Sequence, residues 1–200
     1  MRIGIDIDDT LTNLYEYTIA YGQMYDYEEL EKDSMINPYG YDTPFIFEWS
    51  DEEDKSFWEK YIEEIVTKVN PRPFAVSVIE RLRREGHEIY IITARSNLWY
   101  KNPYKISEEW LLKNKIEYDK LVVSARDKVK ACKENDIDIH IDDSNKHLKE
   151  LTEAGIPVLL YDNVFNKKSD TKLSIRVYSW PQIYNEIQKL TKREKNEKTN

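Results

Sequence analysis

Cysteine and long apolar runs are scarce in this sequence of 200 residues. Cys132 is the single cysteine, which excludes an intramolecular disulfide and agrees with a reducing compartment. The first residues lack the charged-then-apolar pattern of a secretion signal, and no apolar run reaches the roughly 20 residues that a membrane-spanning helix needs. We therefore expect a cytoplasmic protein without a membrane partner.

Positive charge is also limited. The chain has 38 Asp and Glu against 30 Lys and Arg, so its formal net charge is −8. Proteins that bind nucleic acid normally present a basic face or stripe to the phosphate backbone. We expect no stable binding of nucleic acid, although a small anionic ligand is compatible with this charge if a metal ion or a local basic group meets it.

The apolar segments that are present have the lengths of buried strands, and amphipathic segments separate them. This alternation predicts an α/β fold with a doubly wound parallel sheet, whose strands are covered on both faces. Ligands bind to such sheets beyond the carboxyl ends of the strands. The expected strands are 2–6, 88–93, 120–124, 138–142, 157–162 and 175–179, and the expected helices are 74–86, 106–115 with Ser107 as its start signal, 128–135, 145–155 and 180–190.

One long segment interrupts the alternation. Roughly eighty residues separate the first two strands, whereas a crossover between parallel strands needs about a dozen. Helical patterns over 14–25 and 50–69 occupy much of this segment, and Ser50 and Glu53 have the spacing of a capping box. The expected organisation is a core of 1–12 and 72–190, a helical cap inserted at 13–71, and a charged tail at 191–200.

The densest group of like charges comes directly after the first expected strand. Asp6, Asp8 and Asp9 fall within four positions, and such carboxylates raise one another's pKa unless a cation neutralises them. Asp6 and Asp8 are two residues apart at a strand end, where both side chains can face the ligand crevice. This arrangement suits a hard cation with oxygen ligands, such as Mg²⁺.

Polar residues also mark the ends of three further strands. Asp142 and Asp143 follow one strand, Thr93 ends a second and Lys128 follows a third. Each has an ordinary explanation on its own: the acidic pair as a turn or helix cap, Thr93 as an N-cap, and Lys128 as a surface charge. Their joint placement at the carboxyl ends of parallel strands predicts one shared site.

The motifs DIDDT at 6–10, IITAR at 91–95, DK at 127–128 and IDDS at 141–144 occur in this order. Together they resemble the four motifs of the haloacid dehalogenase-like (HAD) superfamily of aspartyl phosphohydrolases, whose core is Rossmann-like. The helical insertion and the stretch NPRPFAVSVIERLRREGHEIYIITAR are most similar to the 5′(3′)-deoxyribonucleotidase branch and its bacterial relatives. The resemblance covers most of residues 1–165.

This resemblance implies a phosphomonoester hydrolase with Mg²⁺ as its cofactor. It makes Asp6 the nucleophile that forms an aspartyl-phosphate, and Asp8 the acid/base for the leaving group and the water. The implied phosphate-binding residues are Thr10, Thr93, Ala94 and Lys128. The implied metal ligands are Asp6, the backbone carbonyl of Asp8, and Asp143 in preference to Asp142, which would then stand behind the metal site.

The motifs leave the roles of two residues open, and they give no ligand role to two histidines. Lys130 is an alternative to Lys128. Arg95 departs from the animal deoxyribonucleotidase pattern and either reaches the substrate or pairs with an acid on the following helix. His87 and His140 have no partner spacing that indicates a ligand role, so we interpret both as structural.

The inserted cap is rich in aromatic residues, and a cap is where the leaving group must be recognised. An exposed aromatic ring can stack on a nucleobase, although most such rings pack a core. The sequence therefore predicts a nucleoside monophosphate as the substrate, without showing which rings contact it. The aromatic residues are Tyr17, Tyr21, Tyr25, Tyr27, Tyr39, Tyr41, Phe45, Phe47, Trp49, Phe57, Trp58 and Tyr61.

Alternative functions share part of this pattern. A phosphatase for another small phosphoester fits the same motifs, whereas the net charge and the long cap disfavour a polynucleotide 3′-phosphatase. A phospho-accepting signalling domain has a similar acidic pair, Thr and Lys, but is usually shorter and lacks the insertion. A binding module without catalysis is disfavoured because every motif residue is present. The oligomeric state, a homodimer included, is left open.

Overall fold

The computed structural model describes residues 1–169 and 172–197 of the chain. Six strands form one all-parallel sheet in the order β3-β2-β1-β4-β5-β6, which confirms the predicted fold class. From β1 the chain adds β2 and β3 toward one edge of the sheet, and then β4, β5 and β6 toward the other edge. The order of the strands therefore reverses between β1 and β4. The strands are β1 (Arg2–Ile5), β2 (Glu88–Ile92), β3 (Lys120–Val122), β4 (Ile139–Asp142), β5 (Val158–Tyr161) and β6 (Ser174–Val177).

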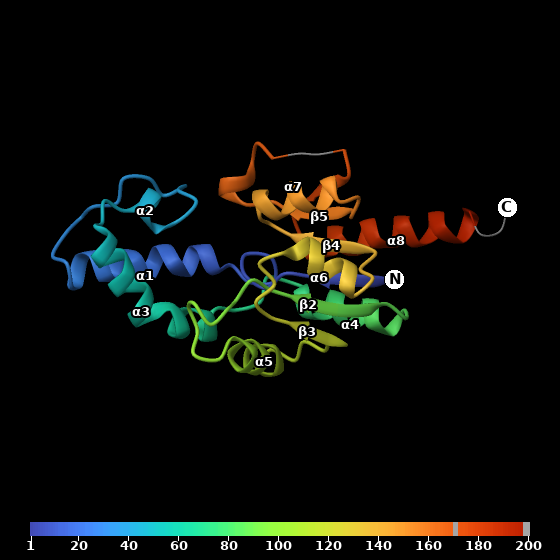
Figure 1. The fold of residues 1–200 in the computed structure, drawn as a ribbon, viewed down its shortest axis with the longest axis horizontal. Helices are drawn as coiled ribbons and strands as arrows, with labels where there is room; N and C mark the ends of the chain where they lie inside the picture. Colours follow the sequence, from blue (N-terminus) through green and yellow to red (C-terminus); the bar gives the residue numbers. More distant parts are fainter. Residues whose placement is uncertain (170–171, 198–200) are drawn as a thin grey trace.

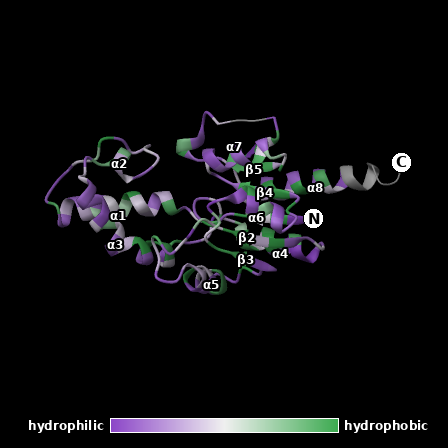
Figure 2. Ribbon diagram, viewed as in Figure 1, coloured by the Kyte–Doolittle hydropathy of each residue, from purple (hydrophilic) through white to green (hydrophobic). Residues whose placement is uncertain are grey.

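Helices cover both faces of this sheet. α4 (Ala75–Arg84) contacts α8 (Trp180–Glu197) on one face, and α6 (Lys128–Glu134) contacts α7 (Asn145–Glu153) on the other. Adjacent residues of one strand face opposite layers: Ile91 packs with the apolar cluster of α4 and α8, and Ile92 with the cluster of α6 and α7. Figure 2 shows the resulting hydrophobic colouring along the central strands.

The helix α5 (Pro103–Lys113) begins earlier than the sequence predicts. Its N-cap is Asn102, whose side chain accepts a hydrogen bond from the backbone N–H of Lys105 at 3.0 Å. Pro103 then occupies the first helical position, where its missing N–H costs nothing. Ser107, the expected start signal, is buried within the helix, so that detail of the prediction is wrong.

The segment 13–71, predicted as the cap, contains three helices: α1 (Leu14–Glu28), α2 (Thr43–Ile46) and α3 (Asp51–Lys68). The capping box of Ser50 and Glu53 is present at the start of α3. Tyr25, Phe57 and Ile65 belong to a separate apolar cluster inside this segment. The three helices lie beyond the carboxyl ends of the strands, at the left of Figure 1.

The C-terminal part of the chain extends the last helix. α8 continues through Glu197, so residues 191–197 of the predicted tail are helical, while residues 198–200 lie outside the described residues. A short 3-10 helix, η1 (Val164–Asn166), follows β5 and was not predicted. Within the described part of the chain, no helix combines the length and the apolar character that crossing a bilayer requires.

Candidate active site

The four motifs meet at the carboxyl edge of the sheet. Asp6 follows the central strand β1, and its backbone N–H donates to the carbonyl of Ile141 in β4 at 3.0 Å. Thr93 follows β2 on the other side, and its backbone N–H donates to Val122 of β3 at 2.9 Å. The site therefore lies where the strand order reverses, the usual place for a ligand in an open α/β sheet.

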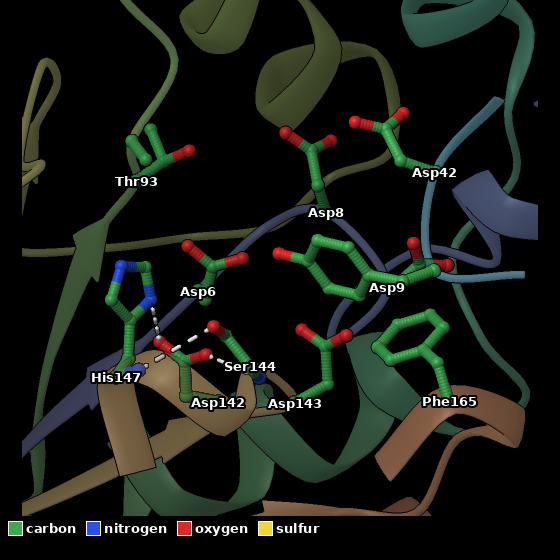
Figure 3. A pocket seen from close by; sticks show the side chains of 12 residues that line it. Asp6, Asp8, Asp9, Asp42, Thr93, Asp142, Asp143, Ser144, His147 and Phe165 are labelled. Atoms are coloured by element: carbon green, nitrogen blue, oxygen red, sulfur yellow. Dashed lines mark hydrogen bonds and ion pairs between the residues drawn. The ribbon is translucent and has the colours of Figure 1, made fainter. Parts of the chain in front are cut away.

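A cavity of about 270 Å³ opens at this edge (Figure 3). The core supplies most of its wall, while the loop before α2 and the helix η1 complete it. Its lining residues are Asp6, Asp8, Asp9, Tyr41, Asp42, Thr93, Ala94, Asp142, Asp143, Ser144, His147 and Phe165.

Lys128 lies directly beneath the cavity. Its side chain is fully buried, and its ammonium group donates to Asp6 and to the carbonyl of Ile92. Burial opposes the charged form, but the carboxylates of Asp6 and Asp142 hold the pKa of Lys128 above its ordinary value. Lys130 instead pairs with Glu134 on the surface at 3.8 Å, so of the two lysines the structure brings Lys128 into the site.

The two acids of the last motif have different surroundings. Asp142 is held from several sides: its Oδ2 lies 3.5 Å from Lys128, 3.2 Å from His140 and 3.3 Å from His147, and its Oδ1 accepts from the Ser144 N–H at 2.8 Å. Burial alone would raise the pKa of Asp142, but Lys128 and the histidines keep it well below its ordinary value. Asp142 is thus engaged as an acceptor on both oxygens.

Asp143 lacks such neutralisation. Its Oδ1 accepts a hydrogen bond from the Thr10 hydroxyl at 3.2 Å. Burial raises its pKa well above the ordinary value, and the charges of Asp9, Asp142 and Asp6 raise it further. Burial also raises the pKa of Asp6 to about 6, despite the nearby Lys128. A cation between Asp6 and Asp143 would remove this destabilisation.

The donor set fits a hard cation that retains water. Within the described residues, no group of three or more His, Cys, Asp or Glu side chains is placed to enclose a metal ion. Asp6 and Asp143 would contribute two carboxylates, with the backbone carbonyl of Asp8 as a third oxygen. Mg²⁺ is commonly held by only one or two carboxylates and keeps several waters, so these residues fit it.

The predicted phosphate-binding residues divide into two groups. Thr93 and Ala94 line the cavity, whereas Lys128, which donates to Asp6, is buried and does not line it. Thr10 is completely buried and does not line it; its hydroxyl orients Asp143, and its carbonyl accepts from the Trp180 indole N–H at 3.3 Å. The geometry thus supports contact with the ligand for Thr93 and an indirect role for Thr10.

Arg95 does not pair with an acid on the following helix, one of the two alternatives considered from the sequence; its partner is Asp8. Its Nε and Nη2 donate to the two oxygens of Asp8 at 2.9 and 2.6 Å, which is a bidentate arrangement. The Arg95 side chain is only 1% exposed, and the ring of Tyr100 lies 5.8 Å from its guanidinium carbon. Arg95 therefore fixes the direction of the Asp8 carboxylate.

Asp9 acts on the backbone of the first motif. It adopts the left-handed φ of 58°, uncommon for a residue other than glycine. Its side chain accepts from the Tyr15 N–H at 2.8 Å, and its carbonyl accepts from Arg72 at 2.9 Å. These contacts hold the turn that directs Asp6 and Asp8 into the cavity.

Sequence reasoning missed several lining residues. Ser144 ends the last motif and His147 follows it closely, so their proximity to Asp142 in the sequence was a usable signal. The sequence did not distinguish Tyr41 from the other aromatic residues of the cap. Asp42 and Phe165 carried no signal, because they reach the cavity only when separate loops come together in space.

Most of the cap aromatics pack against one another. Phe57 and Tyr61 are buried with Tyr25, and Phe47 stacks on Trp49 with ring centroids 4.3 Å apart. Tyr27, Tyr39, Tyr41 and Phe45 are exposed, and of the cap aromatics only Tyr41 lines the cavity described above. Its ring meets Phe165 edge to face at 5.4 Å.

Comparisons with known proteins agree with this arrangement. A family model described as "5′ nucleotidase, deoxy (Pyrimidine), cytosolic type C protein" matches residues 1–194. A nucleotidase of Clostridium acetobutylicum is 29% identical over 191 residues, which cover 95% of each chain.

Solved structures of low sequence identity share the fold. A HAD-superfamily hydrolase of Geobacter sulfurreducens aligns with a TM-score of 0.61 at 14% identity, over 92% of this chain and 97% of the other. A β-phosphoglucomutase of Clostridium difficile gives 0.59 at 16% identity, over 94% and 95%.

Proposed function

We propose that this chain, a member of the cytosolic type C 5′-nucleotidase family of the HAD superfamily, hydrolyses nucleoside monophosphates. The family membership makes it a hydrolase of phosphomonoesters. The proposed reaction uses Mg²⁺ and passes through an aspartyl-phosphate. One observation carries the choice of substrate. Tyr41 from the cap and Phe165 from the core line the same cavity as Asp6 and Asp8, so a phosphate at the acids leaves its organic part beside two aromatic rings.

Contacts of Tyr15 hold Tyr41 and Phe165 in place at the wall of the cavity. The hydroxyl of Tyr15 lies 2.7 and 2.9 Å from the carbonyl oxygens of Pro38 and Gly40, which share its one proton, and this anchors the loop that carries Tyr41. The Tyr15 ring also lies 5.5 Å from Phe165. Base–aromatic contacts of this kind contribute about 1–3 kcal/mol per base.

The first step transfers the phosphoryl group to the enzyme. A carboxylate oxygen of Asp6 attacks phosphorus, the bond to the leaving oxygen breaks, and Asp8 gives that oxygen a proton. Lys128 and Thr93 stabilise the negative charge on the phosphoryl oxygens. Mg²⁺, when bound, would neutralise the repulsion between Asp6 and the incoming phosphate.

The second step regenerates the enzyme. Asp8 takes a proton from a water molecule, the water oxygen attacks phosphorus, and the bond between phosphorus and Asp6 breaks to release inorganic phosphate. Arg95 holds Asp8 by both oxygens, which fixes the direction in which this carboxylate faces the reacting oxygen. The same residue therefore serves as acid and then as base.

A substrate panel tests this proposal. Nucleoside 5′- and 3′-monophosphates, in ribo and deoxy forms, are expected to have higher kcat/KM than ribose 5-phosphate, glucose 6-phosphate or p-nitrophenyl phosphate. Oligonucleotides with a 3′-phosphate should be poor substrates, because the net charge of −8 repels a polyanion. Equal kcat/KM for sugar phosphates and nucleotides would contradict the nucleotidase proposal, and stable phosphorylation without turnover would favour a signalling domain.

A further inference from the structure

The cavity contains one acidic residue that the cleavage reaction does not use. Six of the twelve lining residues are aspartates, and none of these described lining residues is Lys or Arg. Five of these aspartates belong to the first and last motifs and have the roles given above, with Asp9 in the turn of the first motif. Asp42 has none of these roles, and it comes from the cap.

Asp42 is held at the leaving-group side of the cavity. It is the N-cap of α2, where its Oδ1 accepts from the Thr43 N–H at 2.9 Å. The chain before it is fixed by Tyr15 and by the close approach of Gly40 to Phe45, where an added Cβ would lie 2.5 Å from the Phe45 carbonyl oxygen. Both Asp8 and Asp42 line the cavity; in Figure 3 they are drawn in the upper part of the view, and Asp142 and Asp143 in the lower part. Asp42 directly follows Tyr41, which lines the cavity beside Phe165, so it lies on the side where the proposed function places the leaving group.

The cations near this side already have acidic partners. Arg95 is bound to both oxygens of Asp8, and Lys128 to Asp6. In the neighbouring pocket Arg72 faces Asp9 at 4.0 Å and Lys167 pairs with Asp162. The remaining basic group of the lining, His147, contacts Asp142 at 3.3 Å. Among the described residues that line these two pockets, each Lys, Arg and His thus has an acidic partner, and a second phosphate on the leaving group would meet the charge of Asp42.

We infer that Asp42 is a specificity-determining residue that excludes substrates with a second phosphate. The enzyme then hydrolyses monophosphates whose leaving group is uncharged, and it discriminates against the corresponding bisphosphates. The inference rests on the proposed function only for the direction in which the leaving group lies. Since Asp42 is exposed at the cavity mouth, its repulsion is expected to weaken as salt screens it.

The test compares two matched substrate pairs at fixed free Mg²⁺. One pair is a nucleoside 5′-monophosphate and its 3′,5′-bisphosphate, and the other is glucose 6-phosphate and glucose 1,6-bisphosphate. The measured quantity is the ratio of kcat/KM for monophosphate over bisphosphate. Asp42→Asn should lower this ratio by roughly fivefold in both pairs, and Asp42→Lys by more than about tenfold. Raising the salt from about 50 to about 500 mM should shrink the difference between wild type and variants.

Controls separate charge at the cavity from charge elsewhere. Asn keeps the acceptor oxygen that caps α2, so Asp42→Asn retains the local fold, and circular dichroism checks this. Asp33→Asn changes the net charge equally at an exposed cap residue outside the cavity and should leave the ratio unchanged. A ratio in Asp42→Asn equal to that in Asp33→Asn would overturn the inference.

The sugar pair makes the two proposals separable. If sugar phosphates react as well as nucleotides, the nucleotide preference fails, and a lowered ratio within the sugar pair still supports the role of Asp42. If nucleotides are preferred but neither ratio responds to Asp42→Lys, the inference fails and the nucleotidase proposal stands.

Discussion

The core and the cap both bury aromatic and apolar side chains, yet they present different chemistry to the cavity. The core brings carboxylates, a hydroxyl and a buried ammonium group to the ends of neighbouring strands, each fixed by hydrogen bonds. The cap contributes Tyr41 and Asp42 from one loop, while its other aromatics largely stabilise the cap itself. On the proposed function, the core cleaves the phosphate, and the cap, together with Phe165 of the core, selects the leaving group.

The largest effect is expected at the centre of the core. Asp6→Asn removes the nucleophile, so turnover should fall by about 10⁴-fold or more on every substrate. The matched control is Asp136→Asn, an exposed residue at the opposite edge of the sheet that pairs with Arg2; it should change kcat less than about twofold. Activity of Asp6→Asn near that of wild type would disprove the assignment, provided circular dichroism shows a folded protein.

Metal removal should act on the core to a similar extent. Chelation is expected to lower kcat by several orders of magnitude on nucleotides and sugar phosphates alike, because Asp6 and Asp143 would again repel the phosphate. Mg²⁺ should restore activity, and Ca²⁺ should restore little, since its looser coordination misplaces the reacting groups. Full activity in the presence of chelator would refute the metal role of these acids.

In the proposed mechanism Asp8 links the two regions, because it exchanges a proton with the leaving group. Asp8→Asn should lower kcat on nucleotides by about 100- to 10,000-fold through the loss of proton transfer. The loss in the first step should be smaller for p-nitrophenyl phosphate, whose leaving group needs no proton, and pre-steady-state release of p-nitrophenol measures that step. An equal loss of the first step on both substrates would place Asp8 outside the acid/base role.

A smaller effect is expected when the Asp8 carboxylate is merely misdirected. Arg95→Lys keeps the buried charge but loses the fork that holds both oxygens, so kcat on nucleotides should fall by roughly tenfold with little change in KM. The loss should largely disappear in the Asp8→Asn background, because both changes act on one group. Independent, additive losses would show that Arg95 acts by another route.

The contrast between regions also explains how far the sequence could predict the structure. The strands, their parallel order and the residues at their ends follow from apolar patterning and from motifs that the reaction requires. Arg95 was recognised as unusual, but its partner Asp8 lies 87 positions away and neither residue type indicates the pairing. Phe165 could not be predicted, because its place in the cavity depends on how the loop after β5 meets the cap.

Local signals near the helix ends gave mixed results for a related reason. The capping box of Ser50 and Glu53 forms as predicted, because both partners lie within one turn. Ser107 also looked like a cap, but Asn102 and Pro103 begin the helix earlier, which places Ser107 inside the fold.

The division between core and cap is tested most directly by one ratio: kcat/KM for a nucleoside 5′-monophosphate over kcat/KM for ribose 5-phosphate. For a ribonucleotide, the two substrates differ in the base. The ratio therefore isolates what the wall formed by Tyr41 and Phe165 contributes to transition-state binding. Tyr41→Ala and Phe165→Ala should each lower the ratio by roughly tenfold. Tyr27→Ala, which removes an exposed cap tyrosine outside the cavity, should leave it unchanged. The same ratio in all three variants and the wild type would contradict the account.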